Sequence, residues 1–289
     1  MKKNLLKFII GLLGLNIANA QTTINAELVN NLDSLVNESS GLIYSKGKLW
    51  THNDSGGKNR IYQINQQNGK IIQTITINGS TNIDWEDMCQ NKDYLFIGDF
   101  GNNNGNRNNL VIYRIPKSDL LKENASIVTA ERINFTYPDQ IDYSSKPFNT
   151  KFDCEAFVCS GDSLYLFSKD WINLKTRLFS IPSHPGSYTA VLKDSIDAKG
   201  LITSATISHD LNKIYLIGYT KGFPSTSFLI KLSDYKKQDF FTGKINRYDF
   251  SIPHTTQTEA IATGKDDVFY LSSEKGFKKN AKLFSIVIR

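Results

Sequence analysis

A short pattern recurs five times along the chain and constrains its fold more than any other feature. Each copy places a glutamate or a serine at the start of an apolar stretch, which a polar turn and a second β-prone run follow. The five anchor residues are Ser40, Glu86, Glu155, Ser204 and Glu259. The intervals between them are 46, 69, 49 and 55 residues, a spacing that is typical of the blades of a β-propeller.

The two ends of the chain predict how such a ring closes. The last repeat contains three obvious strands, at 258–264, 267–273 and 281–289, whereas residues 22–29 alternate loosely as a strand does. An N-terminal strand that completes the last blade leaves no sheet edge open. We therefore predict that residues 21–289 form one all-β domain, a five-bladed β-propeller whose last blade is closed by the N-terminal strand.

The first 20 residues have the pattern of a signal peptide. A positively charged start is followed by an apolar stretch over Leu5–Ile17 and by Ala18-Asn19-Ala20, which is typical of a cleavage site. The apolar stretch is too short to span a bilayer, and no later stretch is long enough. We predict that residues 1–20 are removed, that the mature protein is exported to the periplasm or secreted, and that it has no membrane span.

Charge and cysteine content limit the classes of partner. The full chain has a formal net charge of +6, and the leader carries three of its lysines and no acid, so the mature chain carries +3. This mild charge does not favour nucleic acid as a partner. The three cysteines are Cys89, Cys154 and Cys159. Buried free thiols are the favoured interpretation, and a bond between Cys89 and Cys159 is the alternative.

Loop lengths indicate which face of the propeller functions. Turns between the first and second strand of each repeat are short, whereas loops between the second and third are long and polar. The long loops cover residues 52–59, 99–109, 169–175, 220–226 and 274–281. Because functional residues concentrate in elaborated loops on a rigid scaffold, we expect the working face where the inner strands begin.

The five anchor residues should meet at the channel mouth on that face. Three carboxylates that lie close together repel one another unless a proton or a cation neutralises them. Five hard oxygen donors without histidine or thiolate suit Ca²⁺, and Mg²⁺ is the second choice. The sequence therefore predicts that Ser40, Glu86, Glu155, Ser204 and Glu259 bind Ca²⁺. The alternative is that the glutamates accept hydrogen bonds from backbone amides at the top of the channel.

A second group of side chains stands where the second strands end, around the predicted ion. From this group we expect Asp54, Asp99 and Lys169 to be catalytic, and His52, Tyr219 and Glu274 to bind ligand. An acidic centre surrounded by basic loop residues favours a small anionic ligand bridged by a metal. Motifs of serine hydrolases, zinc proteases and phosphate-binding loops are absent from the sequence.

At these residues the chain resembles the calcium-activated nucleotidase (apyrase) family of five-bladed propellers. That family holds one central Ca²⁺ with one residue per blade in the order Ser, Glu, Glu, Ser, Glu, and the five anchors stand in the same order. The resemblance implies a pair of arginines for phosphate after the second strand of the third blade, where this chain has Lys169-Asp170. The segments 52–56, 84–87 and 98–103 look closer to exported bacterial propellers of unassigned function.

Two functions remain open from the sequence. The first is a calcium-dependent, nucleotidase-like hydrolase of a phosphorylated or otherwise anionic small substrate. The second is a non-catalytic propeller that binds a ligand or a protein and in which the calcium only rigidifies the ring.

Overall fold

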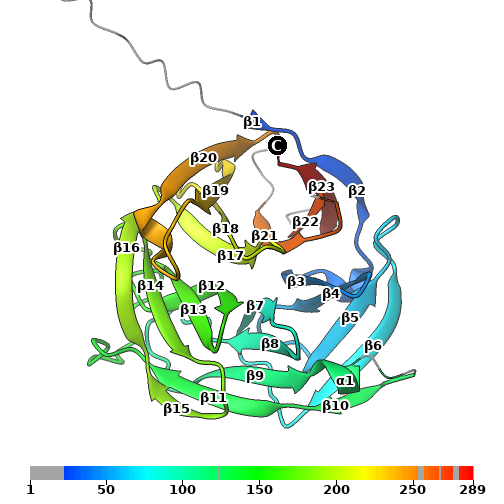
Figure 1. The fold of residues 1–289 in the computed structure, drawn as a ribbon, viewed down its shortest axis with the longest axis horizontal. Helices are drawn as coiled ribbons and strands as arrows, with labels where there is room; N and C mark the ends of the chain where they lie inside the picture. The colour runs from blue at the N-terminus through cyan, green and yellow to red at the C-terminus, as the bar shows by residue number, and fades with distance from the viewer. Residues whose placement is uncertain are drawn as a thin grey trace, which may run out of the picture.

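The computed structural model describes residues 23–120, 122, 124–252, 257–266, 268–275 and 280–288. Five β-sheets stand around a central axis like the blades of a fan (Figure 1). The predicted five-bladed β-propeller is therefore confirmed. The predicted signal peptide lies outside the described residues. No helix in the described part of the chain has the length and apolar content needed to cross a membrane.

Each blade contains four antiparallel strands, which follow one another from the channel outward. Blade 1 contains β3 (Ser39–Ser45), β4 (Lys48–Asn53), β5 (Arg60–Ile64) and β6 (Ile71–Asn78). Blade 2 contains β7 (Trp85–Gln90), β8 (Tyr94–Asp99), β9 (Leu110–Pro116) and β11 (Glu131–Thr136). Blade 3 contains β12 (Asp153–Ser160), β13 (Ser163–Lys169), β14 (Lys175–Pro182) and β16 (Val191–Asp197). Blade 4 contains β17 (Leu201–Ile207), β18 (Lys213–Tyr219), β19 (Ser227–Ser233) and β20 (Lys244–Phe250).

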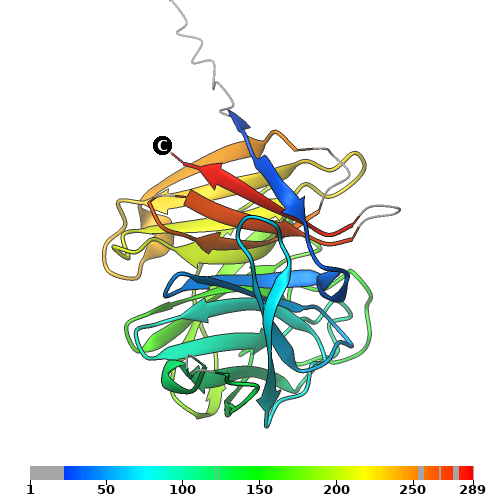
Figure 2. The ribbon, with the colours of Figure 1, turned by 90° about the vertical axis from the view of Figure 1, so that its right-hand side faces the viewer.

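Blade 5 is built from both ends of the chain, as the sequence predicts. Its inner strands are β21 (Thr258–Thr263), β22 (Val268–Ser273) and β23 (Lys282–Val287). Its outermost strand is the N-terminal β2 (Glu27–Asn31), which pairs antiparallel with β23. Figure 2 shows β2, in blue, lying against the red C-terminal strand. The hydrogen bonds of this pairing close the ring.

Three short parallel strands that the sequence patterns did not predict cover the outer edges of blades. β1 (Thr23–Ile24) pairs with β20, β10 (Ile127–Thr129) pairs with β6, and β15 (Gly186–Thr189) pairs with β11. Each comes just before the outer strand of the next blade, so neighbouring blades interlock. The described helical turns are η1 (Ser34–Val36), α1 (Lys117–Leu120) and η2 (Phe240–Thr242).

The core consists of apolar layers between neighbouring blades. Alternate residues of β13 illustrate the arrangement, because successive side chains of a strand point to opposite faces. Leu164 and Leu166 pack against blade 2, whereas Tyr165 and Phe167 pack against blade 4. Both faces of each blade are therefore buried, which explains the nearly continuous apolar runs in the sequence. All three cysteines are buried free thiols, which confirms the favoured interpretation.

Candidate metal centre at the channel mouth

The five inner strands all carry a β-bulge near their first residues, where they begin at the channel mouth. The ladder skips Ser40 and Gly41 in β3, Glu86 in β7, Glu155 in β12, Thr203 in β17 and Glu259 in β21. A bulge re-aims the side chain of the residue outside the ladder. Four of the five predicted anchors therefore occupy bulges, and in blade 4 the bulged residue is Thr203, one position before Ser204.

Two groups of carboxylates come close together at this mouth. Asp54, Asp84 and Glu86 form the first group, and Glu86, Asp153 and Glu155 form the second. Within each group, one carboxylate oxygen of every member lies within 4.8 Å of those of the others. Glu86 belongs to both, and it is almost fully buried, with only 3% of its surface exposed. We name them the Asp54 cluster and the Asp153 cluster.

Glu86 has no built-in counter-charge in the Asp54 cluster. Among the described residues, no hydrogen bond or ion pair reaches its carboxylate. Burial, followed by the charges of Glu155, Asp54 and Asp84, raises its pKa well above the usual value. The loop is shaped to admit this carboxylate, since a Cβ atom at Gly101 would lie 2.0 Å from Glu86 Oε1. Carboxylate oxygens held this close without a partner are the donor set that Ca²⁺ prefers.

The other members of the Asp54 cluster are also poised between two charge states. Burial raises the pKa of Asp54 to about 7, and the charge of Glu274 adds to this effect. Burial likewise raises the pKa of Asp84 to about 7, with the charges of Asp54 and Asp153 adding to it. A bound cation would lower both pKa values and favour the charged forms of the two carboxyl groups.

The Asp153 cluster contains its own cation. Lys169 Nζ lies 2.7 Å from Glu155 Oε1, and both side chains are almost fully buried. Burial acts to lower the pKa of Lys169, but the charge of Glu155 and other acids outweighs it, so the pKa lies well above the usual value. Asp153 accepts hydrogen bonds from the Asn102 amide at 2.6 Å and from Trp171 Nε1 at 2.7 Å. The ammonium group also lies 4.8 Å from the centre of the Trp171 ring.

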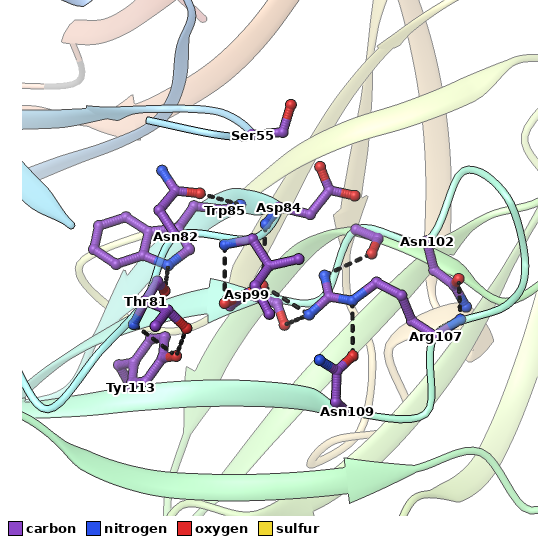
Figure 3. Close-up of polar contacts among 12 residues, drawn as sticks. Ser55, Thr81, Asn82, Asp84, Trp85, Asp99, Asn102, Arg107, Asn109 and Tyr113 are labelled. Carbon is purple, nitrogen blue, oxygen red and sulfur yellow. Dashed lines mark hydrogen bonds and ion pairs between the residues drawn. The ribbon is translucent and has the colours of Figure 1, made fainter. Parts of the chain in front are cut away.

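Asp99 lies beside the mouth but orders the neighbouring loops instead of facing the channel (Figure 3). Its carboxylate accepts a bond from Arg107 at 2.8 Å and another from the backbone amide of Asp84 at 3.1 Å. The other carboxylate oxygen lies 3.4 Å from the amide of Ile83. In Figure 3 the side chain of Asp84 is free of dashed contacts, whereas that of Asp99 is surrounded by them. The structure thus brings Asp84, which the sequence analysis did not select, into the position expected of Asp99.

The two predicted serine ligands use their hydroxyl groups elsewhere. Ser40 Oγ donates to the carbonyl of Glu86 at 2.6 Å. Ser204 Oγ donates to Asp87 Oδ1 at 3.0 Å and accepts from the amide of Ile261. Both serines are buried and join neighbouring inner strands. Each hydroxyl donates its hydrogen in these bonds, which leaves two lone pairs on Ser40 Oγ and one on Ser204 Oγ that the described bonds do not use.

Asp87, the neighbour of Glu86 in β7, has hydrogen bonds to both of its carboxylate oxygens. Its Oδ1 accepts from the amide of Met88 and from Ser204, and its Oδ2 accepts from the amides of Phe157 and Ala205. Burial raises the pKa of Asp87, and these four bonds act against that shift. A single carboxylate thus links blades 2, 3 and 4 across the channel.

The remaining predicted residues surround the mouth at different depths. Glu259 and Glu274 interact with Lys169, and burial raises the pKa of both. The Tyr219 ring centre lies 5.4 Å from Lys169 Nζ.

His52 is fully buried, its Nδ1 lies 3.0 Å from the Asn53 carbonyl, and burial lowers its pKa to about 4. His52 also packs edge-on against Trp85. The His52 side chain therefore lies in the core against Trp85.

Comparisons with known proteins support the architecture alone. No family model and no curated protein matches the chain. Among solved structures, one titled as a crystal structure of glucose dehydrogenase matches with a TM-score of 0.53 and 7% identity, over 90% of this chain and 99% of that one. A second glucose dehydrogenase matches with a TM-score of 0.50 and 8% identity, over 90% and 98%. Hydrazine synthase of Kuenenia stuttgartiensis has a TM-score of 0.41 and 10% identity, and the match covers 84% of this chain but 57% of that one. At these identities the likeness concerns the fold.

A simple signal in the sequence marks two further acids of the clusters, Asp84 and Asp153. Asp84 and Asp153 each stand two residues before a selected glutamate, in the pattern Asp-x-Glu. In each pair the glutamate occupies a bulge, which re-aims its side chain, and both members belong to the same carboxylate cluster. Asp87 gave no such signal, since its role depends on amides of two other blades.

Proposed function

We propose that the channel mouth binds one Ca²⁺ in the Asp54 cluster and that the face above it handles a small anionic ligand. The observation that carries the proposal is the buried carboxylate of Glu86, which two other acids approach and which no described cation or donor balances. The ligand set would be Asp54, Asp84 and Glu86, with water or ligand oxygens completing the coordination. Glu259 and the two serines, which the resemblance to apyrases implies, would then support the ring from outside the coordination sphere of the ion.

The first function that this site supports is hydrolysis of a phosphorylated or otherwise anionic substrate, as in a nucleotidase. A bound Ca²⁺ would supply positive charge to orient the substrate anion and water. Asp54 would bind the ion through one carboxylate oxygen and accept the proton of the attacking water on the other. Lys169 would hold positive charge beneath the site through its contact with Glu155.

The second function is ligand binding without turnover, and a specific observation favours it. Two of the three residues expected to be catalytic, Asp99 and Lys169, are engaged in buried ion pairs at 2.8 and 2.7 Å. Groups held in this way stabilise a loop and a charge cluster before any substrate arrives. A calcium that rigidifies the mouth and bridges to an anion would need no further acid or base.

Metal content and melting temperature test the ion first. Purified protein should contain close to one calcium per chain, and its melting temperature should fall when EDTA removes the ion, since a ligand that binds only the folded state stabilises it. Equal melting curves with calcium and with EDTA, together with no bound metal, would refute the site.

A substrate screen then separates the two functions. Nucleotides, sugar phosphates and lactones should be tested with and without calcium. Calcium-dependent turnover that Asp54→Asn abolishes, with calcium stabilisation kept in part by Asp84 and Glu86, supports the hydrolase. Calcium-dependent binding of an anion without turnover supports the binding protein. We also propose that residues 1–20 direct export, which the mass of the mature N-terminus would test.

A further inference from the structure

The opposite end of the channel forms a second hollow, which takes no part in the function proposed above. Its volume is about 520 Å³. Its walls come mainly from the turns that join the first two strands of blades 1, 4 and 5, and from two residues of blade 2. The lining residues are Tyr44, Ser45, Lys46, Gly47, Gln90, Lys117, His209 and Lys265. We name this hollow the lower mouth.

The charge of the lower mouth is opposite to that of the carboxylate clusters. Its described lining contains three lysines and no acid. Lys46 and Lys265 are exposed, whereas Lys117 is partly buried and its Nζ donates to the Asn91 carbonyl at 2.7 Å. Burial, followed by the charge of Lys46, lowers the pKa of Lys117, and Asp93 opposes this shift. Asp266 lies beside Lys265, but 3.8 Å separates their charged atoms and both side chains are about 80% exposed. Lys46 and Lys117 therefore lie close enough for the charge of Lys46 to act on Lys117.

An inner cavity continues from the lower mouth into the channel. Tyr44, Gln90 and His209 line both spaces, and the inner one measures about 50 Å³. Its deeper walls are mostly apolar, from residues such as Met88, Val158 and Ala262. The hydroxyls of Thr206 and Thr263, which also line it, are bonded to each other at 3.0 Å. Gln90 Oε1, at the boundary between the two spaces, is buried without a hydrogen-bond partner, whereas the walls beyond it are apolar or bonded to each other and favour an apolar occupant.

His209 stands at the boundary between the charged and the apolar parts. Its Nε2 lies 2.7 Å from the carbonyl of Gly264, so this nitrogen carries the proton and donates it. That bond fixes the ring at the turn between β17 and β18. From outside to inside, the lining therefore changes from lysine ammonium groups to the His209 ring and the Gln90 side chain, and then to methyl and thioether groups.

We propose that the lower mouth binds a small organic anion, a carboxylate with a short hydrocarbon chain. The carboxylate would lie among Lys46, Lys117 and Lys265, where ammonium groups form strong charge-assisted hydrogen bonds. The hydrocarbon chain would enter the inner cavity, whose volume suits one or two small groups, since one water molecule takes about 30 Å³ in the liquid. This site is separate from the metal centre and does not depend on it.

Calorimetry of the mature protein with butyrate tests this proposal, with acetate and butylamine as comparison ligands. The titrations should be done in EDTA, so that an anion held by calcium at the other mouth contributes nothing. Butyrate should bind several-fold more tightly than acetate, because its chain fills the apolar cavity, and butylamine should not bind. Lys46→Gln and Lys117→Gln should each weaken butyrate binding several-fold. Lys48→Gln, a lysine of the same hairpin outside the lining, should leave it unchanged.

Three results would overturn the proposal. The first is no butyrate binding at tens of millimolar in low salt. The second is equal affinity for acetate and butyrate, which would mean that the inner cavity takes no part. The third is equal loss of affinity in the Lys48→Gln control, which would mean diffuse attraction to the surface. Amide chemical shifts give a second reading, since bound butyrate should shift the signals of Thr206 and His209.

Discussion

The two carboxylate clusters share Glu86 but differ in how their negative charge is balanced. In the Asp153 cluster, Lys169 lies 2.7 Å from Glu155, and donors from two loops satisfy Asp153. In the Asp54 cluster, the described residues supply no comparable cation within contact distance. The chain itself therefore balances the negative charge of the Asp153 cluster, whereas the charge of the Asp54 cluster needs a proton or an ion to balance it. The difference teaches that an acidic ring in a propeller can be part scaffold and part binding site.

The largest effect should follow from removing the internal cation. Lys169→Met would leave Glu155 buried without its partner, and breaking a buried pair in this way costs about 3–5 kcal/mol of folding free energy. We expect a large fall in melting temperature in EDTA and a partial recovery with calcium, because the Asp153 cluster would then accept a second ion. Metal analysis should give close to two calcium ions per chain in the variant.

If Lys169→Met instead lowers the metal content, the lysine helps to hold the ion and the two clusters are not distinct. Lys175→Met, at an exposed position at the start of the next strand of the same blade, controls for the loss of a positive charge near the mouth.

The next largest effect should come from the residue that both clusters share. Glu86→Gln removes a charge from the Asp54 cluster and should abolish calcium stabilisation, which amounts to about 2.7 kcal/mol at a free calcium concentration 100 times the Kd. Glu259→Gln changes the equivalent bulge of blade 5, outside both clusters, and should preserve most of that stabilisation. Thermal unfolding across a calcium titration measures both. A larger loss of calcium stabilisation in Glu259→Gln than in Glu86→Gln would indicate that the ion lies at the centre of the ring and not in the Asp54 cluster.

The smallest effect should be a pH dependence confined to the calcium-free protein. The pKa values of Asp54 and Asp84 are both raised to about 7 by burial, so the folded state binds more protons than the unfolded state above pH 4. Their contribution to stability is present below about pH 4 and is lost as the pH rises to about 7. In EDTA, stability should therefore decline across this range, and Asp84→Asn should flatten the decline. The increment that calcium adds should grow over the same range, and an increment that stays constant would place the ion away from both aspartates.

The sequence predicted the ring well because the ring depends on local patterns. Repeated apolar runs located the three strands of the last repeat to within two residues, and the missing fourth strand of that repeat was rightly sought at the N-terminus, where β2 begins at Glu27 instead of at residue 22. The parallel strands β1, β10 and β15 were not predicted, since each is short and takes its structure from a neighbouring blade. Their pairing is a property of the assembled ring.

The site was predicted less completely, for a related reason. Glu86 and Glu155 were found because each begins an apolar repeat, and they do approach one another. Asp99 accepts hydrogen bonds from Arg107 and from a loop amide, whereas the Asp84 carboxylate joins the Asp54 cluster. The sequence does not indicate which of the two aspartates takes which role. Ser204 was aligned with the glutamates, but the bulge of β17 falls on Thr203. Register differences of one residue between blades are invisible until strands are paired.

The hydrogen bonds of Asp87 have a consequence for the passage of small molecules along the channel axis. Glu86 faces one mouth, Met88 lines the cavity below the other, and the fully bonded carboxylate of Asp87 stands between them in the same strand. A solute that moved along the axis between blades 2, 3 and 4 would have to break these bonds together, so Asp87 obstructs that part of the axis. Each end of the channel is therefore reached more readily from its own side than through the middle.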